Sequence, residues 1–440
     1  MILYAKTEHD KSKELSLDTS AKLYTYTKTK ELNQTFRVSA LLKEEVRPEL
    51  LEEAIQLCQK RFPSFYVRLE NGFFWKKLKT ENFKSENILI RDTQCCRPIN
   101  FENQHAPLFR VLYSDYRISL EVFHGLTDGH GATTFLKTLL AVYFKLTGIA
   151  VPATNGILDI NEKPKAGELE DSFVKNYSKK FGYLDRNEEP AFQYEPENED
   201  SGLDVMQRRF PVHQIKEITH LLNVSVTEYL TAVYLYSFYL NITDRKNAKP
   251  IKVQVPIDLR PFYHSNTLRN FSLYVNVGLD PKKCSGDFYE ILTQTAEQIR
   301  AGKEMDRLQK MLNANVRDGE MMISRYSPSF LKKPFIHAGF LLYGERLFTS
   351  PMSNLGVIKV PKEMEAHIES FDFVIGETFK NTIWATVASF GDCLTVTFSS
   401  KEANNKIAKT FFDFLHEQGI SDYSDSTQTI HLAGRLAAMM

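Results

Sequence analysis

A histidine and an aspartate separated by three residues stand out in the segment His124-Gly125-Leu126-Thr127-Asp128-Gly129. A neutral imidazole can remove a proton from a hydroxyl or an amine when one ring nitrogen comes within about 3 Å of that proton's heavy atom. A carboxylate, Asp128, follows one tight turn later. The pattern therefore predicts general-base chemistry at His124, with Asp128 held close to it.

The residues around His124 predict how this side chain is positioned. From 117 to 123 apolar side chains alternate with the others, which is the pattern of a β-strand. Three glycines between 125 and 131 predict a turn with backbone angles closed to other residues. Apolar residues then recur at helical spacing from 135 to 144, which predicts an amphipathic helix. We therefore expect His124 at a rigid strand end that faces a cleft.

His124, Asp128 and His130 also allow a metal site, because histidine and aspartate bind zinc. The sequence has no second ligand cluster, and the strand-turn-helix context favours the base, so no metal is expected. Phosphate-binding GxxxxGK[ST] and dinucleotide-binding GxGxxG patterns are absent, as is the GxSxG pattern of serine hydrolases. Nucleotide-dependent chemistry and a serine nucleophile of that type are therefore not supported.

The composition limits the class of protein. Lysine plus arginine and aspartate plus glutamate number 55 each in 440 residues, so no global field attracts nucleic acid or an anionic membrane. No run of about 18 apolar residues occurs, so no transmembrane segment is expected. The start of the sequence lacks the apolar stretch of a signal peptide, and the five cysteines are scattered apart from the pair Cys95-Cys96. We expect reduced thiols and a cytoplasmic location.

Strand and helix patterns are mixed throughout, which predicts an α/β protein of two halves. The stretch 161–204 is rich in acidic residues, proline and glycine, and is expected to cross the surface as a linker. The predicted units are therefore 1–160, which carries the histidine motif, the linker 161–204, and 205–440.

Several local patterns predict individual elements of these halves. A proline at the first turn and apolar residues at helical spacing predict a helix from 48 to 62. Ser225 and Glu228 form a capping box at the start of a buried helix. The remaining predictions are strands at 251–257 and 273–279, hairpins around Asn71-Gly72 and Gly391-Asp392, and a last helix that stops at Gly419.

The histidine motif, HxxxDG, resembles the signature of the chloramphenicol-acetyltransferase-like acyltransferases. This superfamily includes condensation domains, wax-ester synthases and alcohol acetyltransferases. Further matches, in the expected order, are Arg61-Phe62-Pro63 with Phe74-Trp75, Val255-Pro256-Ile257-Asp258-Leu259-Arg260-Pro261 with Asn270-Phe271, and Ser353-Asn354-Leu355-Gly356. They resemble the alcohol-acetyltransferase branch most, over roughly residues 25 to 400. Two departures are Phe123 in place of a first histidine and the absence of the plant Asp-Phe-Gly-Trp-Gly motif.

The resemblance implies a fold, a reaction and a set of roles. The fold would be two chloramphenicol-acetyltransferase-like subdomains, each a mixed sheet flanked by helices, with the active site in a channel between them. His124 would act as the general base in direct transfer of an acetyl or longer acyl group from acyl-CoA to an alcohol or amine. Asp128 would pair with Arg260 of the other half, and Gly129 would permit the turn.

Three points stay open at this level. Ser353 and Asn354 either stabilise the developing oxyanion or merely cap a turn at a strand end. The acyl donor is either coenzyme A, as a co-substrate and not a tightly bound cofactor, or a carrier protein, as in a condensation-type enzyme. A binding or scaffold protein that keeps the fold without turnover is the alternative from another class.

Overall fold

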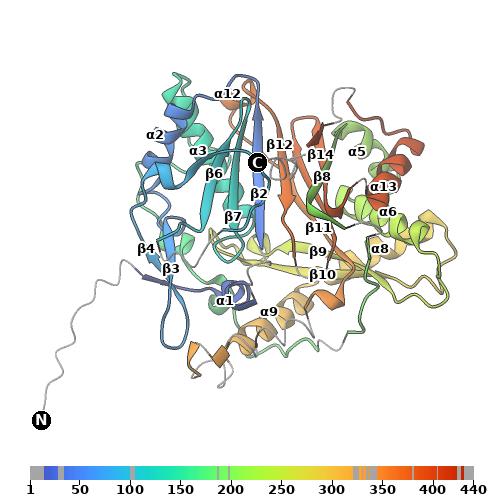
Figure 1. Ribbon diagram of the computed structural model, residues 1–440. Helices are drawn as coiled ribbons and strands as arrows, with labels where there is room; N and C mark the ends of the chain where they lie inside the picture. The colour runs from blue at the N-terminus through green and yellow to red at the C-terminus, as the bar shows by residue number, and fades with distance from the viewer. Residues whose placement is uncertain are drawn as a thin grey trace, which may run out of the picture.

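The computed structural model describes residues 14–27, 34–99, 105–185, 188–196, 199–320, 327–329, 331–332, 336, 344–378, 381–403, 405–423 and 428–430. These residues form two sheets with helices packed against them and a small third sheet (Figure 1). Among these residues, none of the helices combines the length and the apolar character that a membrane span requires.

The first large sheet has five strands in the order β12-β2-β7-β6-β5. Its strands are β2 (Thr35–Leu42), β5 (Leu89–Arg91), β6 (Phe109–Tyr113), β7 (Arg117–Phe123) and β12 (Ile368–Ile375). The β5–β6 pair is parallel and the other pairs are antiparallel, so the sheet is mixed. Helices α2 (Pro48–Cys58) and α3 (Gly129–Leu146) flank it (Figure 1).

The second large sheet has seven strands in the order β10-β9-β11-β13-β14-β8-β15. They are β8 (Glu199–Pro211), β9 (Ile251–Asp258), β10 (Ser272–Leu279), β11 (Ser350–Val357), β13 (Ile383–Phe390), β14 (Cys393–Glu402) and β15 (Gln428–Ile430). Strand β11 runs parallel to both of its neighbours. Helices α5 (Val212–Leu221), α6 (Val226–Asn241), α8 (Phe288–Gly302) and α13 (Lys406–Glu417) belong to this half.

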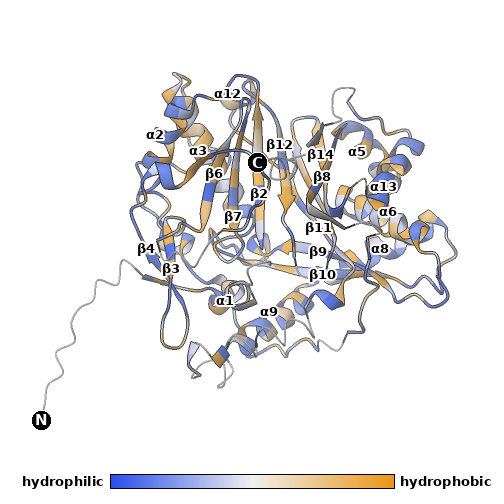
Figure 2. Ribbon diagram, viewed as in Figure 1, coloured by the Kyte–Doolittle hydropathy of each residue, from blue (hydrophilic) through white to orange (hydrophobic). Residues whose placement is uncertain are grey.

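The remaining elements are short or lie at the edges. The small sheet has the order β1-β4-β3, with β1 (Glu14–Ser16), β3 (Val67–Glu70) and β4 (Lys77–Thr80). The helices not yet named are α1 (Thr19–Thr27), α4 (Ser172–Lys175), α7 (Arg260–Tyr263), α9 (Met305–Glu320) and α12 (Lys362–Glu365). Helices α2 and α9 show both blue and orange in Figure 2, as expected when one face of a helix meets the interior and the other meets water.

The predicted fold class is confirmed: each half is a mixed sheet flanked by helices. The halves are not consecutive in the chain, however. Strand β12, close to the C-terminus, pairs with β2 near the N-terminus, and Figure 1 shows the two side by side. The pairing satisfies the edge backbone groups of β2. Strand β8 begins at Glu199, so the last residues of the predicted linker are already part of the second sheet.

Most local predictions are confirmed. The capping box at Ser225 and Glu228 is formed at the start of α6. Strands β13 and β14 pair from Phe390 to Cys393 across a two-residue turn, in which Gly391 has a φ of 57°. Helix α13 ends just before Gly419, whose φ of 80° is open to glycine.

Two local predictions need correction. The hairpin at Asn71-Gly72 exists, but β3 and β4 are joined by a six-residue loop, because they pair only from Glu70 to Lys77. Helix α3 is not amphipathic: apart from Thr133, which is half-buried, its residues from 131 to 144 are all buried. It packs against the first sheet on one side and α2 on another, so little of its surface meets water.

Candidate active site

His124 follows the last residue of β7, at the point where this strand leaves its sheet. Its backbone N–H donates to the carbonyl of Gln34 at 2.9 Å, and that of Leu126 donates to the carbonyl of Phe123 at 2.8 Å. Asp128 then caps helix α3, its Oδ1 accepting from the backbone N–H of Gly131 at 3.2 Å. The predicted strand, tight turn and helix are therefore confirmed, and they leave His124 half-buried.

The imidazole of His124 is held by residues from both halves. The ring of Tyr24, in α1, stacks on it with 4.3 Å between centroids, and Phe36 of β2 meets it edge-on at 5.1 Å. Nδ1 lies 3.2 Å from Oδ1 of Asn270, just before β10. No hydrogen-bond partner of Nε2 is found among the residues that the structure describes. One ring nitrogen is therefore anchored and the other is left for chemistry.

Burial lowers the pKa of His124 below its ordinary value of 6.5, because the charged imidazolium loses its hydration there. A hydrogen bond to the ring's own backbone carbonyl, the negative charge of Asp128 and the hydrogen bond with Asn270 act in the opposite direction without reversing the shift. The imidazole is therefore neutral at pH 7, which is the form that a general base needs.

Asp128 and Arg260 form the ion pair expected between the halves. Arg260 Nη1 lies 2.9 Å from Asp128 Oδ2, and Nη2 lies 3.0 Å from Oδ1, so the contact is bidentate. Burial by itself raises the pKa of Asp128, but the Arg260 guanidinium outweighs it and holds the pKa below 3.8. Both side chains are almost completely buried, so neither faces a substrate.

The three glycines of the turn do not have unusual backbone angles, and at Gly131 it is the space that requires glycine. None of Gly125, Gly129 and Gly131 has a positive φ, so the expected conformational reason is wrong. A Cβ on Gly131 would lie 2.2 Å from the carbonyl oxygen of Leu268, and one on Gly129 would lie 2.6 Å from Cδ2 of Leu355. The chain of the second half passes too close here for a side chain.

Ser353 and Asn354 lie half-buried in β11. The amide of Asn354 donates to Thr227 Oγ1 at 3.0 Å and accepts from the backbone N–H of Gly356 at 2.7 Å, so it is used within the turn. The Ser353 hydroxyl makes no hydrogen bond to any other residue in the described part of the chain. Because the neighbouring Leu355 meets Gly129, this end of β11 lies beside the start of α3.

The residues of the metal alternative do not gather into a ligand set. Both oxygens of Asp128 are occupied by Arg260, and the exposed His130 lies nearer to Asp258, with its Nδ1 3.6 Å from Oδ2. A carboxylate that neutralises a guanidinium is a poor ligand for a cation. The geometry therefore favours the base interpretation over the metal one.

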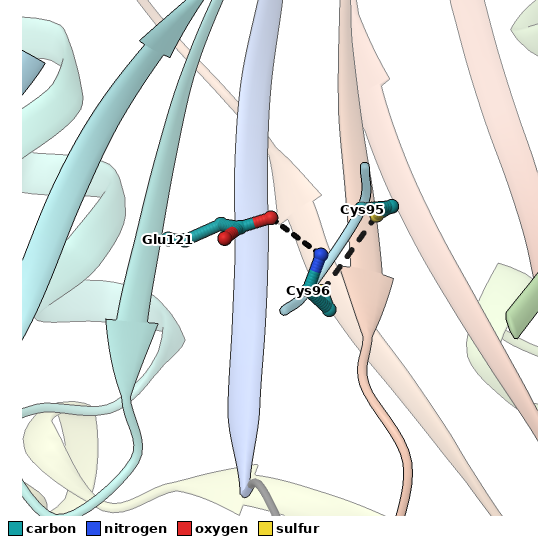
Figure 3. A group of neighbouring side chains, drawn as sticks. All are labelled: Cys95, Cys96 and Glu121. Carbon is teal, nitrogen blue, oxygen red and sulfur yellow. Dashed lines mark hydrogen bonds between the residues drawn. The ribbon is translucent and has the colours of Figure 1, made fainter. Parts of the chain in front are cut away.

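A second group, Cys95, Cys96 and Glu121, brings metal-ligating atoms close together (Figure 3). The two sulfur atoms are 3.7 Å apart. Glu121, however, accepts from Arg37 Nη2 at 2.6 Å and from Arg110 Nε at 2.6 Å, one arginine on each oxygen. Burial also raises the pKa of Cys96, which keeps it a thiol. The two guanidinium charges already fulfil the role of a cation here.

Several residues that contact His124 or its partners were not identified as such from the sequence. Asn270 was noted only as part of a motif, and Tyr24 and Asp18 carried no signal at all. Each lies about 100 residues or more from His124 in the chain, so no local spacing links them to it. Only the tertiary packing of the chain brings them together.

No family model matches this sequence, and no curated protein matches it. Solved structures do match. The trichothecene 15-O-acetyltransferase TRI3 of Fusarium sporotrichioides is 11% identical, with a TM-score of 0.59 over 93% of this chain and 96% of that one. TRI101 of the same fungus, solved with coenzyme A and T-2, is 11% identical, with a TM-score of 0.64 over 93% and 99%.

The starter condensation domain of rhizomide synthetase, a mutant solved with C8-CoA and Leu-SNAC, is 12% identical, with a TM-score of 0.58 over 96% of this chain and 97% of that one. Each likeness covers nearly the whole of both chains. At this identity it establishes the fold: the two-subdomain fold that coenzyme A-dependent acyltransferases share with condensation domains.

Proposed function

We propose that this protein is an acyltransferase in which His124 acts as the general base. The observation that carries the proposal is the state of the imidazole. It is neutral, its Nδ1 is anchored by Asn270, and its Nε2 has no partner among the described residues. The fold supports the same conclusion, since acetyltransferases and a condensation domain share it.

In the proposed reaction, Nε2 of His124 takes the proton of an acceptor hydroxyl or amine as its oxygen or nitrogen attacks the thioester carbonyl. The carbon–sulfur bond then breaks, and the imidazolium returns the proton to the departing thiolate. The products are an ester or amide and a free thiol, without an acyl-enzyme. Such a base contributes about 10² to 10⁴ in rate, and holding both substrates in one site supplies much of the remainder.

Ser353 is the better of the two proposed oxyanion donors. Its hydroxyl has no other partner among the described residues, whereas the Asn354 amide is bound to Thr227 and Gly356. A donor must be able to turn toward the oxygen on which negative charge develops. Asn354 is accordingly assigned to shaping the turn that presents Ser353.

The proposed donor is acyl-CoA, used as a co-substrate, and the proposed acceptor is a small alcohol or amine. Two of the similar structures were solved with coenzyme A or an acyl-CoA, and in one of these the other molecule is T-2. A donor tethered to a carrier protein is the second candidate, favoured by the similarity to a condensation domain.

Release of free thiol tests the proposal. The protein is incubated with acetyl-CoA and longer acyl-CoAs, with and without pooled alcohols and amines. Thiol release that requires an acceptor, together with a product heavier by the acyl group, supports the transferase. Release without an acceptor indicates a thioesterase instead. No thiol release with any acyl-CoA, together with turnover of an acyl carrier protein, selects the second candidate. No turnover with either donor selects the scaffold protein.

A further inference from the structure

The loop that joins β3 to β4 carries three consecutive aromatic residues, Phe73, Phe74 and Trp75, and extends below β3 in Figure 1. The side chains of Phe73 and Phe74 are exposed, and 72% of the surface of Phe73 meets water. Removing rings of this size from water is favourable. Single exposed apolar residues are common, but adjacent ones at the end of a loop form a patch, and such patches mark interaction sites.

The described residues between 327 and 332 extend this patch. The backbone N–H of Ser329 donates to the carbonyl of Phe73 at 2.8 Å, and the ammonium group of Lys332 donates to the carbonyl of Phe74. Leu331, which precedes Lys332, has an exposed side chain. These hydrogen bonds bring an exposed leucine close to the two phenylalanines of the loop.

Helix α1 also borders the loop. Tyr26 meets Trp75 edge-on, with 5.4 Å between the ring centroids, and its hydroxyl accepts from the backbone N–H of Lys76 at 3.2 Å. Leu23, about one turn earlier in the helix, is exposed. The exposed apolar side chains of the three segments therefore form one surface, the apolar tip, which consists of Leu23, Phe73, Phe74 and Leu331.

The segments that form the apolar tip carry positive charge. Helix α1, the loop 71–76 and the described residues between 327 and 332 contain no aspartate or glutamate and three lysines, Lys22, Lys76 and Lys332. Glu70, the last residue before the loop, is paired with Arg68 at 3.0 Å. The whole chain has no net charge, so the positive charge at the tip is a local excess.

Two of these lysines lie over the ring of Trp75. The Nζ atom of Lys332 is 3.6 Å from the ring centroid and that of Lys22 is 5.2 Å from it, both within the range of a cation–π contact. Burial and the charge of Lys22 lower the pKa of Lys332 to about 8, so Lys332 is mostly charged at pH 7. Exposed aromatic rings and positive charge therefore occur together at the tip.

We propose that the apolar tip binds the surface of a lipid bilayer that contains anionic lipids. Phe73 and Phe74 insert between the acyl chains, Trp75 lies at the level of the headgroups, and the three lysines attract the anionic headgroups. A stable protein interface buries about 800 Å² on each partner, which one loop and its neighbours do not readily offer. Reversible binding to a membrane needs only a few inserted side chains supported by charge.

Helix α1 connects the apolar tip to the candidate active site. Tyr26 contacts Trp75 of the loop, and Tyr24, two residues earlier, stacks on His124. Binding through the tip therefore holds the candidate active site close to the bilayer, where apolar molecules concentrate. The inference does not rest on acyl transfer, and it can be tested without any substrate.

The fluorescence of Trp75 tests the proposal. The chain has two tryptophans, and the other, Trp384, is fully buried. The full-length protein is titrated with vesicles of phosphatidylcholine alone and of equal parts of phosphatidylcholine and phosphatidylglycerol. With the anionic vesicles we expect a blue shift, quenching by lipids brominated in their acyl chains, and co-sedimentation that weakens as salt is added. Trp75→Phe should lose the blue shift and the quenching and still sediment with the vesicles.

Two sets of variants separate the apolar contribution from the charge. Replacing Phe73 and Phe74 together by serine should weaken vesicle binding about tenfold for each ring. Lys76→Gln should weaken binding to anionic vesicles about fivefold and leave binding to neutral vesicles unchanged. Leu221→Ser is the matched control, because Leu221 is 85% exposed but lies at the end of α5 in the second half. This variant should bind as the wild type does.

Three results would overturn the proposal. The first is a wild-type protein that sediments with neither kind of vesicle. The second is equal binding by the wild type and the double serine variant, with Phe73→Ser alone as the check if the double variant melts at a lower temperature. The third is binding to an acyl carrier protein, and not to vesicles, that the double variant loses, because the tip then recognises a protein. Thiol release is measured separately, so the failure of this proposal and that of the proposed function are distinguishable.

Discussion

Glu121 lies on strand β7 and His124 just after its end, three residues later in the chain. Their two polar clusters differ in whether any polar atom is left without a partner. Glu121, in mid-strand, has an arginine on each carboxylate oxygen and accepts in addition from the backbone of Cys96 at 2.5 Å (Figure 3). His124, just past the strand end, has one nitrogen bound and the other without a partner among the described residues. A saturated cluster, in which every polar atom has a hydrogen-bond partner, stabilises the fold, whereas a general base needs one nitrogen without a partner.

Asp128 shows that closeness to His124 in the chain does not decide whether a residue takes part in the chemistry. It is only four residues from His124, yet its two oxygens accept from Arg260, from Gly131 and from Phe271. In this respect Asp128 resembles Glu121 and not His124. The comparison therefore assigns Asp128 to positioning, and variants can test that assignment.

The largest effects are expected from breaking the two saturated clusters. Asp128→Ala and Glu121→Ala each remove a buried carboxylate from buried guanidinium groups. Arg260 keeps Asp258 and Arg37 keeps Asp92, so the loss of unfolding free energy should lie near the lower end of the range of about 3–5 kcal/mol for a broken buried pair. Urea denaturation measures this loss. The two variants should differ in the rate per folded molecule. Asp128→Ala should lose activity because position 128 no longer accepts a hydrogen bond from the backbone of Phe271, next to Asn270. Glu121→Ala should keep its activity. Equal rates for the two would remove the distinction.

Replacing the proposed oxyanion donor comes next. Ser353→Ala should lower kcat about 10² to 10³-fold, the range for one donor, with an unchanged melting temperature. Asn354→Ala is the control, because its amide contacts Thr227 and Gly356 within the turn. It should lower the melting temperature more than Ser353→Ala does. Full activity in Ser353→Ala would leave the oxyanion without an assigned donor.

A smaller effect distinguishes the two glycines of α3. Gly131→Ala forces a Cβ against the carbonyl of Leu268, which is backbone, and overpacking of this kind costs roughly 1–3 kcal/mol. Gly129→Ala meets only the end of the Leu355 side chain, which can rotate away. Thermal denaturation of both should therefore show the larger loss in Gly131→Ala. The reverse order would argue that the turn, and not the contact between halves, needs glycine.

The smallest expected effect is in the pH dependence. Because burial places the pKa of His124 below 6.5, the acidic limb of kcat/KM should have its midpoint below pH 6.5, where the base becomes protonated. Asn270→Asp adds a negative charge beside the ring, which raises that pKa and moves the acidic limb to higher pH. A limb with its midpoint above pH 6.5 in the wild type would contradict the neutral, buried imidazole.

The sequence predicted the parts of this site that are local or carried by motifs. Alternation before His124 and helical spacing after it gave the strand and helix, and the motif resemblance paired Asp128 with Arg260. It could not predict that Asn270 and Asp18 complete the site, because contacts across 146 and 252 residues depend on how the halves pack. The same holds for β12, whose place beside β2 no local pattern encodes.

The glycines show another limit. Their clustering predicted special backbone angles, yet the structure gives them ordinary ones and uses their small size where the halves approach. A glycine required for space and one required for φ look the same in a single sequence. Only the path of the opposing chain, here at Leu268, distinguishes the two.

The most direct test of the account is acceptor-dependent thiol release by His124→Ala beside His130→Ala. Both remove an imidazole from the segment 124–130, but His130 lies in the first turn of α3, is exposed, and has its Nδ1 3.6 Å from Oδ2 of Asp258. The account predicts a loss of about 10² to 10⁴-fold in kcat for His124→Ala, at an unchanged melting temperature, and near wild-type activity for His130→Ala. Equal activity of the two variants would contradict the assignment of His124 as the base.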